Sequence, residues 1–310
     1  MLWAILTIKR NKMFVEAIEE VSKFTRPIHT ITRNYKEEIV RPGASTLFFV
    51  NEDGYAVTCK HVIDLLRQRS AVNEHYTNFY KEKNTLGKDK YTQRLRELEV
   101  KYNYKSTKDK PITIQIKELF VGCTSNESFN YRWIDHPKYD LSILIFENFK
   151  KPLYESYAKF VKDGSTIKQG KFLCRLGYPF PEFTNYKYNQ DVDDIEWTNE
   201  GQTGTPRFPI EGMVTRHLLN ESELFGLEIS TPGLRGQSGG PLFDKEGLIC
   251  GMQFQTNALH LGFDMKNFEY NSNGDTIKVN NQPFLHVGHC IHVDIIKEFL
   301  KTNNVKYYEQ

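Results

Sequence analysis

The chain has 310 residues, 39% of them hydrophobic, which is enough to build one large all-β domain or two ordinary domains. Its 41 basic and 39 acidic residues leave a formal net charge of +2, so the overall charge gives no reason to expect nucleic acid or an anionic membrane as an obligatory partner. We therefore expect a soluble globular protein whose binding sites are local.

The first residues, MLWAILTI, form a short apolar run, and Lys9 and Arg10 follow it, which is the wrong order for a secretory signal. No later stretch approaches the roughly 20 apolar residues of a membrane span, so a cytoplasmic location is expected. The five cysteines are odd in number and form no CxxC pair, which predicts reduced thiols that pack as small apolar groups. They are Cys59, Cys123, Cys174, Cys250 and Cys290.

Residues 13–24 predict a short amphipathic helix that opens the fold and packs on a barrel. Its apolar positions at helical spacing are Phe14, Ile18, Val21 and Phe24. From Ala44 onward the pattern changes to short runs rich in β-branched and aromatic residues. The runs 45–50 and 55–59, joined by the turn Asn51-Glu52-Asp53-Gly54, predict a β-hairpin.

Further runs of this composition predict strands at 112–116, 119–123, 141–146, 171–177, 224–230, 248–254 and 284–293. Many short strands separated by turns are typical of an all-β barrel or sandwich and not of a βαβ fold.

Two segments interrupt this rhythm. Residues 71–110 are polar and rich in lysine and tyrosine, and they predict a helical insertion with a solvated outer face. Its inner stripe consists of Tyr91, Leu95, Leu98 and Tyr102. Residues 183–208 predict a long loop or an irregular hairpin. Residues 293–303 predict a closing helix, with Ile295, Ile296, Phe299 and Leu300 on one face.

The segment Gly236-Gln237-Ser238-Gly239-Gly240 has the composition that a serine nucleophile needs. A serine hydroxyl is a weak nucleophile that requires a neighbouring base and backbone N–H groups aimed at the developing oxyanion. Gly236 can turn its own N–H and that of Ser238 toward one point, and the following glycines leave room for a substrate chain.

Three segments occur in the order that a known family would require. GQSGGPLFDKEGLICGM (236–252) resembles the nucleophile segment of trypsin-like peptidases, GASTLFFVNEDGYAVTCKHVID (43–64) resembles the hairpin that delivers their catalytic histidine, and HPKYDLSILIF (136–146) resembles the segment that delivers their aspartate. KFLCRLGYPF (171–180) is similar to Deg-type (high-temperature-requirement) enzymes. VGHCIHVDIIKEFLK (287–301) is similar to Deg-type enzymes and to glutamyl endopeptidases.

The resemblance implies a chymotrypsin-like fold of two packed six-stranded antiparallel β-barrels, with the helical insertion and a C-terminal helix added. The expected parts are residues 1–24 as an N-terminal segment and short helix, 25–150 as the first barrel with the insertion at about 71–110, and 151–310 as the second barrel and closing helix. No regulatory peptide-binding domain is expected.

The same resemblance implies a serine endopeptidase without cofactor or metal, which cleaves peptide bonds through an acyl-enzyme. Ser238 would attack, His61 would be the general base, and Asp140 would orient that base. The N–H groups of Gly236 and Ser238 would form the oxyanion hole. A catalytically silent trypsin-like scaffold or binding module is the alternative, and labelling of Ser238 by a fluorophosphonate would distinguish the two.

The matching strands of the family place the substrate pocket at 231–235, 254–256 and Gly288. The predicted pocket residues are Thr231, Pro232, Arg235, Phe254, Gln255, Thr256 and Gly288. None is acidic, which disfavours Lys or Arg before the scissile bond because a buried cation needs a paired charge. Gln253 stands where glutamyl endopeptidases carry a histidine, so an uncharged residue is expected there.

In secreted trypsin-like zymogens the residue before the nucleophile is an aspartate, which pairs with a freshly cut N-terminal ammonium. Here it is Gln237, and no Ile-Val-Gly-Gly type of cleavage site precedes the first barrel. The sequence therefore predicts that the unprocessed chain is either active as made or switched by a ligand or partner.

Two other features are open to a binding interpretation. His289 and His292 flank Cys290, but no further ligand pair with metal spacing lies nearby, which favours packing or pocket-wall roles. Lysines, arginines and tyrosines between 76 and 96 mix bases with aromatics, as single-strand nucleic-acid binders do. Acidic residues interleave these positions, which favours a solvated helical face over a nucleic-acid site. The expected partners are protein or peptide substrates, and a partner protein at the insertion.

Overall fold

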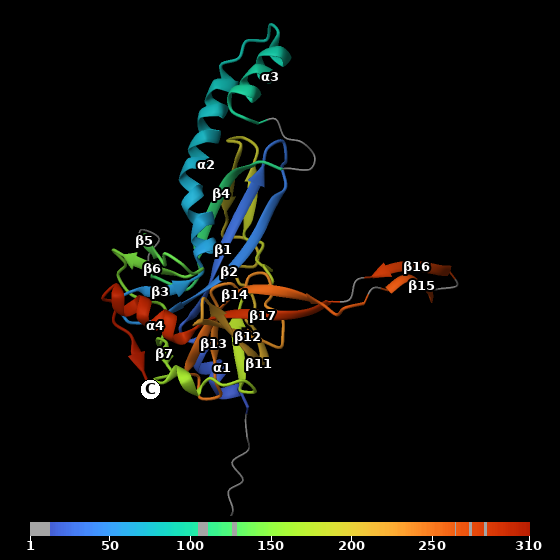
Figure 1. The fold of residues 1–310 in the computed structure, drawn as a ribbon. Helices are drawn as coiled ribbons and strands as arrows, with labels where there is room; N and C mark the ends of the chain where they lie inside the picture. The colour runs from blue at the N-terminus through green and yellow to red at the C-terminus, as the bar shows by residue number, and fades with distance from the viewer. Residues whose placement is uncertain (1–12, 105–110, 126–128, 264, 273–274, 282–283) are drawn as a thin grey trace, which may run out of the picture.

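Two large β-sheets form the body of the protein, and helices lie around them (Figure 1). The computed structural model describes residues 13–104, 111–125, 129–263, 265–272, 275–281 and 284–310. The chain is mostly β with added helices, which confirms the predicted fold class.

The first sheet has the strand order β4-β1-β2-β3-β6-β5, and all its pairs are antiparallel. Its strands are β1 (Thr25–Asn34), β2 (Val40–Phe49), β3 (Tyr55–Thr58), β4 (Thr113–Phe120), β5 (Asn130–Asp135) and β6 (Ser142–Glu147). In the described ranges the edge strands β4 and β5 do not pair, so this sheet is a half-barrel. The two strands expected at 112–116 and 119–123 are one strand, β4.

The second sheet closes into a ring because β13 pairs with both β8 and β14. The ring runs β13-β8-β11-β12-β17-β14, and β7 and β18 extend it in parallel from β14. The strands are β7 (Lys159–Phe160), β8 (Phe172–Gly177), β11 (Phe208–Asn220), β12 (Glu223–Ile229), β13 (Pro241–Phe243), β14 (Ile249–His260), β17 (Phe284–His292) and β18 (Tyr308–Glu309).

The helices lie in the segments that the sequence predicted, and the start of one of them differs from the prediction. α1 (Val15–Ser22) and α4 (Val293–Thr302) lie where they were predicted, and a single 3-10 turn, η1, spans Gly164–Thr166. The insertion forms α2 (Lys60–Asn84) and α3 (Tyr91–Lys101), so its helix begins well before residue 71. Residues 1–12 and 105–110 of the predicted segments lie outside the described residues.

Strand β1 was not predicted, because five of its residues are polar side chains that are nevertheless buried. They are Thr25, His29, Thr30, Arg33 and Asn34. Arg33, for example, donates to Gln115 Oε1 at 2.7 Å and pairs with Asp193 at 2.8 Å. Such partners come from distant parts of the chain, so the strand lacks the apolar alternation that marks a half-buried strand.

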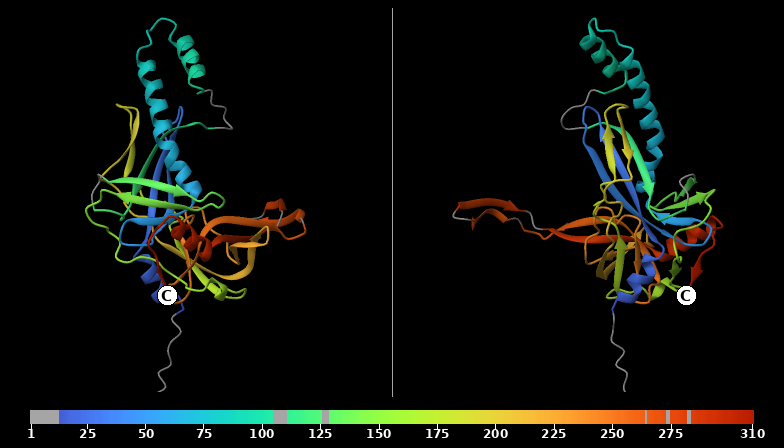
Figure 2. Two further views of the ribbon diagram at one scale, coloured as in Figure 1. Left: turned by 60° about the vertical axis from the view of Figure 1, so that its left-hand side comes forward. Right: turned by 180° about the vertical axis from the view of Figure 1, so that it is seen from behind.

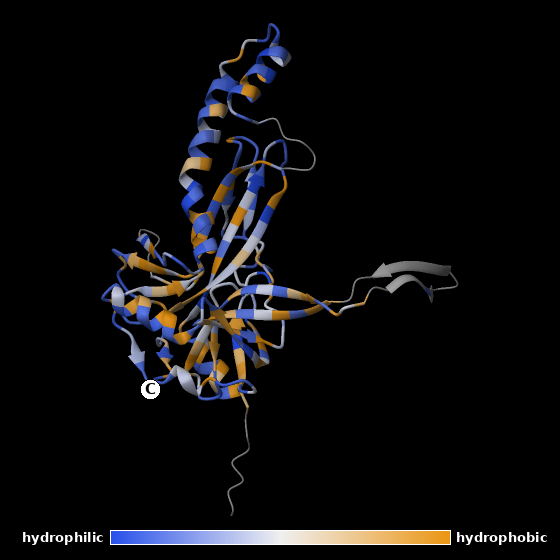
Figure 3. Cartoon of the chain, viewed as in Figure 1, coloured by the Kyte–Doolittle hydropathy of each residue, from blue (hydrophilic) through white to orange (hydrophobic). Residues whose placement is uncertain are grey.

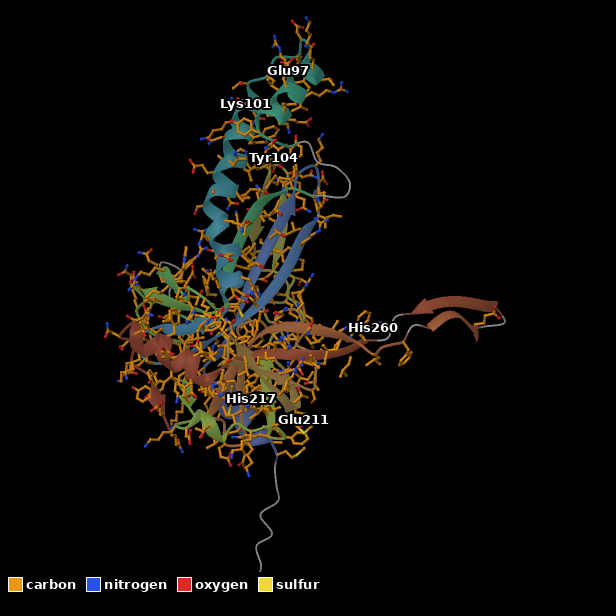
Figure 4. All side chains as sticks on the ribbon, viewed as in Figure 1. Glu97, Lys101, Tyr104, Glu211, His217 and His260 are labelled. Carbon is orange, nitrogen blue, oxygen red and sulfur yellow. The ribbon has the colours of Figure 1, made fainter. Side chains whose placement is uncertain are left out.

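Two further hairpins lie on the surface. β9 (Tyr186–Asn189) and β10 (Asp194–Trp197) form the irregular hairpin expected within 183–208. β15 (Met265–Ser272) and β16 (Asp275–Asn281) pair at the far end of an arm that β14 and β17 extend from the body (Figure 2). His260 marks this arm in Figure 4, whereas Glu211 and His217 lie on the second sheet.

The main core is continuous through both sheets, α1 and α4. Hydropathic colouring shows apolar residues gathered in this body, whereas α2 and α3 are largely hydrophilic (Figure 3). Among the described residues, no helix has the length and apolar character to cross a membrane.

The insertion packs against the ends of β1 and β4 through a second, small core, which we call the aromatic cluster. Its buried members are Tyr35, Tyr76, Phe79, Leu98, Tyr104 and Ile114. Figure 4 labels Tyr104 below α3 and alongside α2, and it labels Glu97 and Lys101 on α3. Tyr76 is only 6% exposed and its hydroxyl donates to Asp193, so it is not free to stack on nucleic-acid bases.

Phe79→Ala is expected to loosen the projection formed by α2 and α3 without unfolding the body. The ring is fully buried among aromatic neighbours, and removing such a side chain costs about 3–5 kcal/mol. Hydrogen exchange should accelerate in the second half of α2 and in α3 and stay unchanged in β8 and β14. Phe48→Ala, in the main core, is the contrasting variant and should lower protection throughout the body. Uniform loss of protection in Phe79→Ala would contradict a separate core.

Candidate active site

The imidazole of His61 and the carboxylate of Asp140 form a hydrogen-bonded pair. His61 Nδ1 lies 2.6 Å from Asp140 Oδ2, and the backbone N–H of His61 donates to Asp140 Oδ1 at 2.9 Å. One carboxylate therefore holds both the main chain and the ring of the same residue. The ring is half exposed, with 49% of its side-chain surface accessible, so its second nitrogen is not locked inside the core.

Sheet register explains why these residues meet. β3 pairs with β6, and Thr58 lies opposite Ser142, so the ends of the two strands are neighbours. α2 starts directly after β3, which places His61 in its first turn and not at a strand end. Cys59, the residue that caps α2, makes no side-chain capping bond, and Asp140 accepts from an otherwise unpaired N–H of that turn instead.

Ser238 lies in the loop between β12 and β13, which two glycines shape. Gly236 has φ +100° and Gly239 has φ +85°, both in the region that favours glycine. A Cβ on Gly239 would lie 2.0 Å from the carbonyl oxygen of Thr46, so no other residue fits there without a shift.

Thr46 of β2 holds this loop against the first sheet. Its N–H donates to the carbonyl of Ser238 at 3.0 Å, and its hydroxyl donates to the carbonyl of Gly236 at 2.8 Å. The hydroxyl of Thr58 in turn donates to the carbonyl of Thr46 at 2.8 Å. The strand that leads to His61 is thus bonded, through one buried threonine, to the loop that carries Ser238.

Gln237 fixes the same loop from within. Its side chain is fully buried, accepts from the N–H of Leu234 at 3.0 Å and donates to the carbonyl of Phe208 at 3.1 Å. The backbone N–H groups of Gly236 and Ser238 donate to no other described residue. They are the two groups that the sequence assigned to an oxyanion hole.

A cleft of about 520 Å³ separates the two sheets at this point. His61 and Ser238 both line it. The first sheet and α2 also contribute Thr30, Gly43, Ala44, Ser45, Val62, Leu65 and Leu66, and the second sheet and its loops contribute Gly233, Leu234, Arg235, Gly236, Gln253, Phe254, Gln255 and Thr256.

Four of the seven predicted pocket residues line this cleft: Arg235, Phe254, Gln255 and Thr256. Thr231, Pro232 and Gly288 do not line it. Instead they surround the guanidinium of Arg175. Arg175 was not identified as a site residue from the sequence. The available signal was an arginine inside the apolar strand KFLCRLG.

The structure separates the two histidines that suggested a metal. His289 Nε2 lies 3.3 Å from the buried carboxylate of Glu228, and His292 Nδ1 accepts from the N–H of Asp294 at 3.2 Å as the cap of α4. Within the described residues, only Cys59, His61 and Asp140 bring three donor atoms within 4.8 Å of one another.

That group fits a metal poorly. The Cys59 thiol is fully buried and donates to the carbonyl of Gln253 at 3.3 Å, and burial holds its pKa well above the usual value. A metal ligand would be the thiolate, and the imidazole and carboxylate already satisfy each other.

Comparison with known proteins is consistent with this geometry. A family model described as a trypsin-like peptidase domain matches residues 45–252, which is more than half of the chain. Among curated proteins, none matches.

Gln237→Ala is expected to lower the free energy of unfolding by about 1–3 kcal/mol, because it leaves the N–H of Leu234 and the carbonyl of Phe208 without partners in the interior. Denaturant unfolding measures the change. Gln68→Ala, on the exposed face of α2, is the matched control and should stay within about 0.5 kcal/mol of the parent. Equal stability of the two variants would show that Gln237 does not order the loop.

Proposed function

Because this chain belongs to the trypsin-like peptidase family, we propose that it is a serine endopeptidase in which Ser238 is the nucleophile, His61 the general base and Asp140 the residue that orients the base. The observation that carries the proposal is that His61, hydrogen-bonded to Asp140, lines the same cleft as Ser238. Proteins or peptides are the substrates that such a family acts on.

In the first step, Ser238 Oγ attacks the carbonyl carbon of the scissile peptide bond, and its proton passes to His61 Nε2. Asp140 accepts from Nδ1, which fixes the tautomer whose Nε2 can take a proton and then stabilises the imidazolium. The imidazolium protonates the leaving amine, and the C–N bond breaks. Water then attacks the acyl-enzyme, with His61 again as base, and Ser238 regains its proton.

The developing oxyanion is expected to accept from the N–H groups of Gly236 and Ser238. Both residues line the cleft, and neither N–H is used by another described residue. Donors held ready in this way stabilise the transition state without reorganisation, and one such donor contributes about 2.7–4 kcal/mol in related sites.

Ser238→Ala and His61→Ala should each abolish turnover of a peptide library and labelling by a neutral fluorophosphonate, in which Oγ displaces fluoride. The double variant should be hardly slower than either single variant, because the groups act as a unit. Ser70→Ala, exposed on α2, is the control and should label like the parent. A much larger loss in the double variant would contradict a single catalytic unit.

A folded parent protein that fails to label would instead favour the alternative, a catalytically silent scaffold or binding module of the same fold. In that case the cleft would serve recognition only. We propose that the projection formed by α2 and α3 selects a partner or substrate in either case, because it leads directly from the turn that holds His61.

The contacts of Gln237 also bear on activation. The neutral amide cannot pair with a new N-terminal ammonium, yet it makes two hydrogen bonds that order residues 234–237. We therefore propose that the chain needs no N-terminal cleavage to form its oxyanion hole.

Intact-mass spectrometry of fluorophosphonate-labelled protein tests this proposal. Label on protein that retains all 310 residues is the expected result. Label confined to a species trimmed near Arg41 would contradict it, and a protease-deficient expression host excludes accidental trimming.

A further inference from the structure

Arg175, in the middle of β8, is the largest fully buried side chain of the described residues. It has no exposed surface, although arginine is almost never buried without a paired charge. No carboxylate of the described residues pairs with the guanidinium, and its electrostatic neighbours are the thiols Cys290 and Cys174.

Neutral oxygens hold the guanidinium in place. Nη2 donates to the carbonyl of Thr231 at 2.9 Å, to its hydroxyl at 2.6 Å and to the carbonyl of Pro232 at 3.0 Å. Nη1 donates to Gln253 Oε1 at 2.6 Å. A guanidinium has five N–H donors, and Nε has no partner among the described residues. The positive charge is therefore neither neutralised nor fully hydrogen-bonded.

This charge lies directly behind the cleft that Ser238 lines. Gln253 connects the two, because its side chain bonds Arg175 and also lines the cleft. A Cβ on Gly233 would lie 2.2 Å from Gln253 Nε2 and 2.9 Å from Thr256 Oγ1, so an amide and a hydroxyl occupy the space beneath Gly233. A Cβ on Gly288 would lie 2.0 Å from Arg175 Nη1, so only glycine leaves room for the guanidinium.

We propose that Arg175 makes the peptidase select an acidic side chain, glutamate in the first place, before the scissile bond. The inference rests on the proposed function and replaces the expectation of an uncharged residue. The substrate carboxylate would reach Gln253 from the cleft, take the place of the Gln253 side-chain oxygen on Arg175 Nη1, and lie against the guanidinium as its missing counter-ion.

The physical reason is the low polarisability of the protein interior. A buried charge without a partner is strongly disfavoured. The attraction between it and an opposite charge that reaches it is far stronger than the same attraction in water. A basic side chain entering the same cleft would meet repulsion, and a neutral amide would gain hydrogen bonds alone. Arg175 thus discriminates between glutamate and glutamine, which have nearly the same shape.

The test uses the full chain and two peptide substrates that are identical except for Glu or Gln before the scissile bond. We expect kcat/KM to be roughly tenfold to a hundredfold higher for the Glu peptide, as for other close pairs of desolvated charges. Equal rates, or faster cleavage of the Gln peptide or of a Lys peptide, would overturn the inference without requiring any variant.

Arg175→Met removes the charge and keeps much of the volume, and it should bring the Glu/Gln ratio close to one while cleavage of the Gln peptide persists. Arg207→Met, at an exposed arginine paired with Glu19, is the matched control and should keep the parent ratio. If Arg175→Met does not fold, Arg175→Lys is used, and it should lower the ratio because a lysine cannot reproduce the fork of bonds. An unchanged ratio in a folded Arg175 variant would refute the assignment.

Labelling by the neutral fluorophosphonate separates this inference from the proposed function. Labelled parent protein that shows no preference for the Glu peptide would overturn the role of Arg175 alone. Parent protein that neither labels nor cleaves any peptide would overturn the peptidase, and the inference with it.

Discussion

The arrangement of the candidate active site depends on the hydrogen bonds of one buried threonine. Thr46 belongs to the first sheet, and its N–H and hydroxyl both bond carbonyls of the loop that carries Ser238. A third bond, to Tyr178 N–H at 3.2 Å, ties the same hydroxyl to the turn after β8. Because buried bonds of this kind are lost together when the sheets separate, the relative position of the two sheets and the geometry of the cleft are set at the same place.

The first sheet contributes the other half of the site, and strand pairing, not nearness in the sequence, brings its residues together. His61 and Asp140 meet because β3 and β6 pair, and a one-residue slip would turn both strands' side chains to the wrong faces. The carboxylate that orients the ring also caps α2, so the helical projection and the His61–Asp140 pair share one anchor. This explains why a long insertion can follow His61 directly without disturbing it.

The sequence predicted the parts of this site that local patterns encode. The hairpin before His61, the strand after Asp140 and the glycines around Ser238 are contiguous signals, and the structure places them as expected. It did not predict β1 or the start of α2, because both depend on polar contacts with distant residues. Arg175 was missed for the same reason: its partners at 231, 232 and 253 are far away in the chain, and three residues assigned to the pocket wall surround it instead.

Gln253 connects the loop that carries Ser238 to the charge of Arg175. Its carbonyl accepts from the N–H of Gly239 at 2.9 Å, its N–H donates to Gly240 at 2.9 Å, and its side-chain oxygen accepts from the guanidinium. An unpaired buried cation lowers the stability of the folded chain, since a well-packed apolar residue would avoid the desolvation. A ligand that completes the ion pair would account for such a residue behind the cleft that Ser238 lines. Burial of the unpaired Arg175 lowers the stability of the free protein. In the proposed complex a substrate carboxylate pairs with this charge, so the same burial strengthens binding, and Gln253 links the ion pair to the cleft in which the peptide bond is cleaved.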